Sequence, residues 1–181
     1  MNLPNVISLA RLISVPAVIW LIVAGHLAAA FWLFVAAGLS DAVDGAIAKG
    51  WGLTSELGGY LDPIADKALI GAVFVALGWR GDVPVWLAIL VVSRDLLLVG
   101  GTVLTVALGQ SLTIAPIMIS KINTAGQIAL AAVVLGEPGL GVDFGPAQAV
   151  LTPVVAVTTV LSGGLYVVGW AKRQPKSGDR P

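Results

Sequence analysis

The chain has 181 residues, of which 57% are hydrophobic and only 11% are charged, and its formal net charge is zero. Soluble domains usually carry about 25% charged residues, so this composition favours a membrane protein. A net charge of zero gives no indication of a nucleic-acid partner, and the absence of cysteine excludes disulfides and thiolate metal sites.

Charged residues and helix breakers divide the sequence into six apolar spans, each near the 20 or so residues that a membrane helix requires. In chain order these spans are 5–24, 27–48, 61–79, 84–107, 119–136 and 146–170. The segments between them are rich in turn residues and read Gly25-His26, "GWGLTSELGG", "RGDVP", "LGQSLTIAP" and "GEPGLGVDFGP". His26 is interpreted as an interfacial loop residue. We predict an all-α integral membrane protein with six transmembrane helices.

The distribution of basic residues predicts the orientation of these spans. If the N-terminus lies inside, the inner side collects Lys49, Lys121, Lys172, Arg173, Lys176 and Arg180, whereas the outer side holds only Arg80. The positive-inside rule then places both termini in the cytoplasm. We expect one membrane domain over residues 1–171 and a polar, disordered cytoplasmic tail over 172–181. Arg11, well inside the first span, argues against a cleaved signal peptide.

Four of the eight aspartates fall within one 26-residue window on the inner side. Asp41 and Asp44 are three residues apart near the end of the second span, and Asp62 and Asp66 are four residues apart in the third, so each pair shares a helix face. We expect "LDPIADK" to begin the third helix, because Pro63 loses no hydrogen bond in a first turn. The short connection then lets the two pairs face each other across an antiparallel hairpin.

Four carboxylates so placed would repel one another strongly in a medium of low dielectric constant, unless some are protonated or cations neutralise them. Mg²⁺ is held by carboxylates together with substrate phosphates, and two such ions would form a clamp for phosphoryl chemistry. The alternatives are solvated surface acids, or an acid-lined ion or proton carrier. Gly45 and Ala48 leave the helix surface bare for a ligand, although close helix packing would also use small residues.

The acidic window matches a known sequence signature. It reads Asp41-x2-Asp44-Gly45-x2-Ala48-Lys49-x8-Gly58-x3-Asp62-x3-Asp66. This resembles the signature of the CDP-alcohol phosphatidyltransferases, D-x2-D-G-x2-A-R-x8-G-x3-D-x3-D, with every spacing preserved. Lys49 is the one departure, since it stands where the family usually has arginine. Lysine keeps the positive charge but lacks the bidentate fork of the guanidinium group.

The resemblance implies a six-helix membrane enzyme, commonly a homodimer, that transfers a phosphatidyl group from CDP-diacylglycerol to an alcohol and releases CMP. It implies that the four aspartates bind two divalent cations, Mg²⁺ or Mn²⁺, and that Asp66 is the general base. The segment "NLPNVISLARLISVP" is similar to the branch that acts on glycerol-type acceptors. The implied CDP-diacylglycerol site comprises Asn5, Ser8, Arg11, Asp44, Gly45, Ala48, Lys49 and Gly58. The alternative for Arg11 is an interfacial anchor.

Two further strings bear on the acceptor alcohol. "VVSRDLLLVGG" (91–101) and "ISKINTAGQ" (119–127) resemble the eukaryotic-type cardiolipin synthases, whereas phosphatidylglycerophosphate synthases tend to carry A-R-E and G-K-x-K-T there. A neutral amide at Asn123 suits phosphatidylglycerol, and a second lysine beside Lys121 would suit glycerol 3-phosphate. We therefore expect phosphatidylglycerol as acceptor and cardiolipin as product, with glycerol 3-phosphate as the alternative acceptor, and Arg94, Lys121 and Asn123 as acceptor-binding residues.

Arg94 and Asp95 lie deep in the fourth span. Arg94 is expected either to bind the acceptor phosphate or to form a structural ion pair with a buried acid. Neighbouring residues on a helix do not face each other, so Arg94 and Asp95 are expected to meet different partners. The absence of a transit-like N-terminal extension favours a bacterial inner membrane, with the active site on its cytoplasmic side.

Overall fold

The computed structural model describes residues 3–51, 56–107 and 118–171, and the side chains of residues 10, 12–40, 67–101 and 118–169. The described residues form six α-helices and connecting turns. The helices are α1 (Leu3–Val23), α2 (Leu27–Trp51), α3 (Glu56–Arg80), α4 (Val85–Ala107), α5 (Met118–Leu140) and α6 (Gly145–Ala171). The all-α prediction and its six helical segments are confirmed within these residues.

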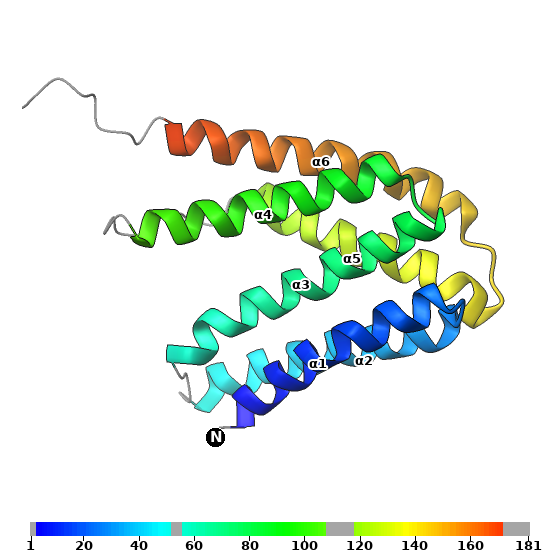
Figure 1. The fold of residues 1–181 in the computed structure, drawn as a ribbon, viewed down its shortest axis with the longest axis horizontal. Coiled ribbons are helices and arrows are strands. Elements are labelled where there is room, and N and C mark those ends of the chain that lie inside the picture. Colours follow the sequence, from blue (N-terminus) through cyan, green and yellow to red (C-terminus); the bar gives the residue numbers. More distant parts are fainter. Residues whose placement is uncertain (1–2, 52–55, 108–117, 172–181) are drawn as a thin grey trace, which may run out of the picture.

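The six helices alternate in direction between two ends of an elongated bundle (Figure 1). One end, called the site end here, carries the start of α1, the end of α2 and the start of α3. The opposite end, called the turn end, carries the turns that follow α1, α3 and α5. Neighbouring helices pack in the cyclic order α2, α1, α3, α4, α6 and α5, with α5 closing onto α2.

α1 packs against both α2 and α3, the two helices that carry the acidic pairs. That these pairs face each other stays a prediction.

The turns that follow α1 and α3 have the same backbone design. Gly25 and Gly81 adopt φ angles of 83° and 85°, which glycine reaches without strain. The amide after each glycine donates back to a carbonyl five residues earlier, His26 N to Leu21 O at 2.8 Å and Asp82 N to Leu77 O at 3.0 Å. This is the Schellman arrangement, which satisfies carbonyls that a helix end leaves without partners. His26 lies exposed in the first turn, as expected.

The two largest differences from the predicted helix boundaries are at the start of α3 and at the end of α5. α3 begins at Glu56 rather than at 61, so Pro63 lies seven residues inside the helix and not in its first turn. α5 continues past 136 to Leu140 and includes Pro138 near its end. Polar residues beyond a hydrophobic span do not end a helix by themselves, and membrane-protein helices tolerate an internal proline. The expected breaker "LGQSLTIAP" lies outside the described residues.

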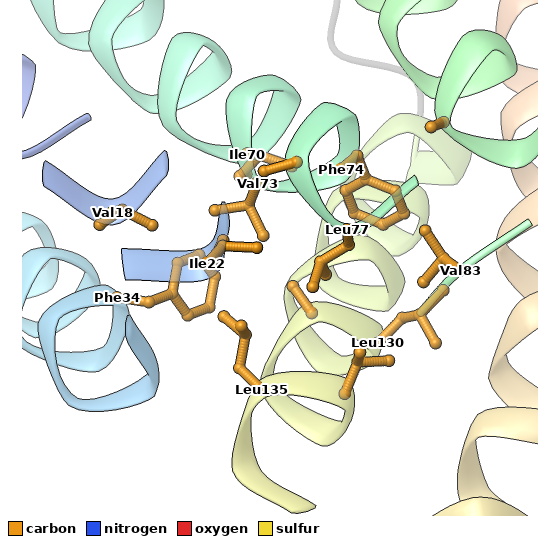
Figure 2. Packing of buried hydrophobic residues seen from close by; sticks show 14 of the residues in the cluster. Val18, Ile22, Phe34, Ile70, Val73, Phe74, Leu77, Val83, Leu130 and Leu135 are labelled. Atoms are coloured by element: carbon orange, nitrogen blue, oxygen red, sulfur yellow. The ribbon is translucent and has the colours of Figure 1, made fainter. Parts of the chain in front are cut away.

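The packed core lies between α1, α2, α3 and α5, with the start of α4 against it (Figure 2). Its fully buried members include Val18, Ile22, Val73, Phe74, Leu77, Leu130 and Leu135. Small residues let the helix backbones approach: a Cβ atom built on Gly78 would lie 2.9 Å from the Cβ of Ala88 in α4. Close approach of this kind is typical of helix packing inside membranes, where side-chain contact holds the helices together.

The outer surface has the polarity of a membrane protein. Large apolar side chains are exposed along the outer helices, for example Leu96 at 67% and Val150 at 63%, whereas polar side chains are buried inside. Two described helices, Met118–Leu140 and Gly145–Gly169, are long and apolar enough to cross a membrane. Exposed tryptophans lie near the helix termini at the turn end, namely Trp20, Trp32, Trp79 and Trp86. Tryptophan is enriched where a membrane meets water.

Candidate active site

The backbone brings the three segments of the predicted donor site to the site end of the bundle (Figure 1). Asp41 and Asp44 lie in the last three turns of α2, and Asp62 and Asp66 lie in the first three turns of α3. Asn5 and Arg11 lie in the first three turns of α1, and this helix packs on both α2 and α3. Segments that are far apart in the sequence therefore begin or end at one end of the molecule.

Side chains of the predicted donor site lie outside those that the structure describes. These residues are Asn5, Ser8, Arg11, Asp41, Asp44, Gly45, Ala48, Lys49, Gly58, Asp62 and Asp66. Among the described residues, no group of three or more histidine, cysteine, aspartate or glutamate side chains could hold a metal ion. The four aspartates offer carboxylate oxygens alone, which is the donor set that Mg²⁺ and Mn²⁺ prefer. The metal site stays a prediction on those aspartates.

A buried ionic network begins one residue after Asp66. Lys67 Nζ in α3 lies 3.2 Å from Asp95 Oδ1 in α4, and Arg94 Nη1 donates to the same oxygen at 2.6 Å. The side chains of Arg94 and Asp95 are only 3% and 9% exposed, whereas that of Lys67 is 29% exposed. Charges buried to this extent need partners, because transfer of an unpaired charge out of water costs several kcal/mol.

Arg94 also connects α4 to the two helices behind it. Its Nη2 atom donates to Ser120 Oγ in α5 and to Ser162 Oγ in α6, both at 2.6 Å. The structural ion pair with a buried acid is thus what the structure contains. The expectation that Arg94 and Asp95 meet different partners is wrong in part, because they pair with each other as well as with other helices. Residues next to each other in a helix point in different directions. The side chain of Arg94 is nevertheless long enough to fold back to Asp95.

A second polar cluster lies between α5 and α6. Asn123 is fully buried, and its Oδ1 atom accepts hydrogen bonds from Thr158 Oγ1 at 2.9 Å and from Thr159 Oγ1 at 2.8 Å. Gln127, one turn further along α5, is 1% exposed. The Nδ2 atom of Asn123 and the Nε2 atom of Gln127 are buried and have no hydrogen-bond partner in the described part of the chain.

The predicted acceptor residues separate into two groups. Arg94 and Asn123 lie in the interior, and Ser120, which binds Arg94, is one helical turn from Asn123. Lys121 is exposed on the outer side of α5. The structure therefore does not bring Lys121 to the same face as the other two, and their shared role in acceptor binding stays a prediction.

Sequence reasoning did not include several members of this interior. They are Lys67, Ser120, Gln127, Thr159, Ser162 and Tyr166. Their spacing was the available signal. Ser120, Asn123 and Gln127 follow one another at three and four residues, which puts polar groups on a single face of an apolar helix. Polar residues on one face of a membrane helix usually point into the bundle.

Known proteins resemble this chain over most of its length. The family model described as CDP-alcohol phosphatidyltransferase matches residues 1–161. A rice chloroplast protein named CDP-diacylglycerol--glycerol-3-phosphate 3-phosphatidyltransferase 1 is 37% identical over 194 residues, which cover 97% of this chain and 59% of that protein. Human "Cardiolipin synthase (CMP-forming)" is 32% identical over 181 residues, covering 91% of this chain and 60% of the human protein.

A bacterial relative matches over more of its own length. The Mycobacterium tuberculosis protein named "Probable phosphatidylglycerophosphate synthase" is 34% identical over 173 residues, which cover 92% of this chain and 80% of the relative. The chain spans about three fifths of the length of the rice and human relatives. The match of the family model over most of the chain establishes that the chain belongs to the CDP-alcohol phosphatidyltransferase family.

Proposed function

We propose that the protein transfers a phosphatidyl group from CDP-diacylglycerol to a glycerol-type alcohol and releases CMP. The observation that carries this proposal is the signature from Asp41 to Asp66, which keeps all four aspartates and every spacing and departs from the family pattern only at Lys49. It extends over the end of α2 and the start of α3 in a chain of this family. α1, which carries the proposed nucleotide residues, packs on both helices.

The four aspartates would hold two divalent cations, Mg²⁺ or Mn²⁺, which when bound supply charge neutralisation on the diphosphate of the donor. Asp66 takes the proton of the attacking alcohol hydroxyl. The alcohol oxygen bonds to the phosphorus of the phosphatidyl group, and the bond from that phosphorus to the CMP oxygen breaks. A positioned base is needed because an alcohol hydroxyl has a high pKa. Gly45 and Ala48 leave room for the cytidine nucleotide, and Arg11 and Lys49 supply positive charge for its phosphates.

Phosphatidylglycerol is the proposed acceptor, with cardiolipin as the product. The support is the neutral, buried amide of Asn123 and the exposure of Lys121, since a small dianion such as glycerol 3-phosphate calls for converging cations. Relatives named for either product resemble the chain to a similar degree, so glycerol 3-phosphate is the second candidate.

The acceptor is tested with purified protein, Mg²⁺ and CDP-diacylglycerol labelled in the phosphatidyl group. Phosphatidylglycerol and glycerol 3-phosphate are supplied separately, and the lipid products are resolved by chromatography. We expect labelled cardiolipin with phosphatidylglycerol. A labelled product formed with glycerol 3-phosphate alone would reverse the choice of acceptor while leaving the phosphatidyl transfer intact.

We further propose that the six helices cross a membrane, that both termini lie in the cytoplasm and that the protein acts as a homodimer. The exposed tryptophans at the turn end and the apolar outer faces support the membrane placement.

The orientation is tested by labelling. The chain contains no cysteine, so single cysteines introduced at Asp143 and Lys176 can be labelled with an impermeant reagent in closed cells. We expect labelling at Asp143 only, and labelling at Lys176 alone would invert the orientation. A bacterial inner membrane stays our prediction for the location.

A further inference from the structure

We propose that Asp95 is a positioning residue that holds the Lys67 ammonium group away from the carboxylates of α3, so that these remain free to bind divalent cations. This inference rests on the proposed function, because it takes Asp62 and Asp66 as metal ligands. Lys67 follows Asp66 directly in the sequence, and its ammonium group is carried on a flexible four-carbon stem.

Asp95 has a closer cationic partner than Lys67. Arg94, which is itself buried, already donates to Asp95 Oδ1 at 2.6 Å and neutralises that carboxylate. Lys67 approaches the same oxygen at 3.2 Å as a second cation. The second contact adds little to the neutralisation of Asp95, so its main effect is to fix the position of the Lys67 ammonium group on the α4 side.

Without Asp95, the Lys67 ammonium group would be attracted to the aspartates that precede it in α3. An ammonium group paired with those carboxylates occupies their oxygens and adds positive charge where divalent cations must bind. Interaction between charges a few ångströms apart is strong at the effective dielectric constant of a partly buried site. Loss of Asp95 should therefore weaken metal binding, and it should do so through Lys67.

The test is a double-mutant cycle on the full chain in detergent, without lipid substrate. Binding of Mn²⁺ is followed by the loss of the electron paramagnetic resonance signal of the free ion. We expect Asp95→Asn to raise the dissociation constant for Mn²⁺ about tenfold. In a Lys67→Met background the same substitution should change it by no more than about twofold, because the group through which Asp95 acts is absent.

Two results would overturn the inference. One is wild-type affinity in Asp95→Asn, and the other is an equal loss in both backgrounds, which indicates a general charge effect. Asp82→Asn is the matched control: it removes the same charge from the ion pair with Arg80 at the turn end and should leave Mn²⁺ binding unchanged. If Asp95→Asn does not fold, Asp95→Ser replaces it in the cycle, since the serine hydroxyl can still accept a hydrogen bond from Arg94.

The same titration separates this inference from the proposed function. Wild-type protein should bind Mn²⁺, and Asp41→Ala should abolish that binding. Equal binding by these two proteins would contradict the metal site itself. Binding that depends on Asp41 but not on Asp95 would contradict only the role of Asp95.

Discussion

Arg94 lies inside the bundle with partners on three helices. Asp95 neutralises its charge, and the hydroxyl groups of Ser120 and Ser162 accept hydrogen bonds from its Nη2 atom. A buried ion pair is costly to break, because removal of one partner leaves the other charged group without compensation. Arg94 therefore fixes how α4, α5 and α6 meet, next to the helix that carries Asp66.

We expect Arg94→Met to destabilise the protein by about 3 to 5 kcal/mol, since Asp95 would keep only the longer contact with Lys67. The measurement is thermal unfolding of the purified protein in detergent. Arg80→Met is the matched control, because the Arg80–Asp82 pair is exposed at the turn end, and such pairs contribute less than about 1 kcal/mol. Equal losses of stability in the two variants would contradict a structural role for Arg94.

At the scale of residues, the sequence predicted the buried position of Arg94 but not its partners. Depth in an apolar span is a property of the sequence, whereas the serines that accept its hydrogen bonds come from helices 26 and 68 residues away. Nothing in the sequence distinguishes Lys67 from a solvated surface charge. Its role becomes visible only with Asp95 across the α3–α4 contact.

At the scale of elements, the apolar spans predicted all six helices, because a run of about 20 apolar residues is easily recognised in a sequence. The largest error was the start of α3, at Glu56 and not at 61. Hydropathy marks the apolar part of a helix and not the polar turns that continue it.

The order in which the helices pack could not be predicted. All six spans are apolar on most sides, so periodicity does not identify which face meets which neighbour. The packing of α1 against both α2 and α3 could therefore not be predicted from the pattern of apolar residues.

Close contact between α3 and α4 gives a prediction at this scale. A Cβ atom at Gly78 would lie 2.9 Å from the Cβ of Ala88, so Gly78→Leu must push the two helices apart. We expect a loss of stability of about 1 to 3 kcal/mol in thermal unfolding. Gly164→Leu in α6 is the control, because nothing lies within 4 Å of its Cβ position. That variant should be neutral or slightly more stable, and an effect as large as that of Gly78→Leu would contradict the packing argument.

At the scale of the whole molecule, the two ends of the bundle differ in structure. The turn end is closed by short turns, and Gln148 Nε2 near the start of α6 donates to the carbonyl of Asp82 at 2.7 Å, which joins α6 to the turn between α3 and α4. At the site end, the end of α2 and the start of α3, which carry the signature, lie near the start of α1 (Figure 1). Buried polar groups between α3, α4, α5 and α6 connect the outer helices to the helix that carries Asp66.

The most direct test of the central claim is the release of CMP from CDP-diacylglycerol labelled in its cytidine, by the full chain in detergent with an acceptor present. We expect release by the wild-type protein only when Mg²⁺ or Mn²⁺ is supplied. Asp66→Asn should still bind CDP-diacylglycerol but lose at least about 100-fold in turnover, the scale of a missing general base. Near-normal turnover by Asp66→Asn, or ion flux across vesicles without any release of CMP from the wild-type protein, would contradict the account.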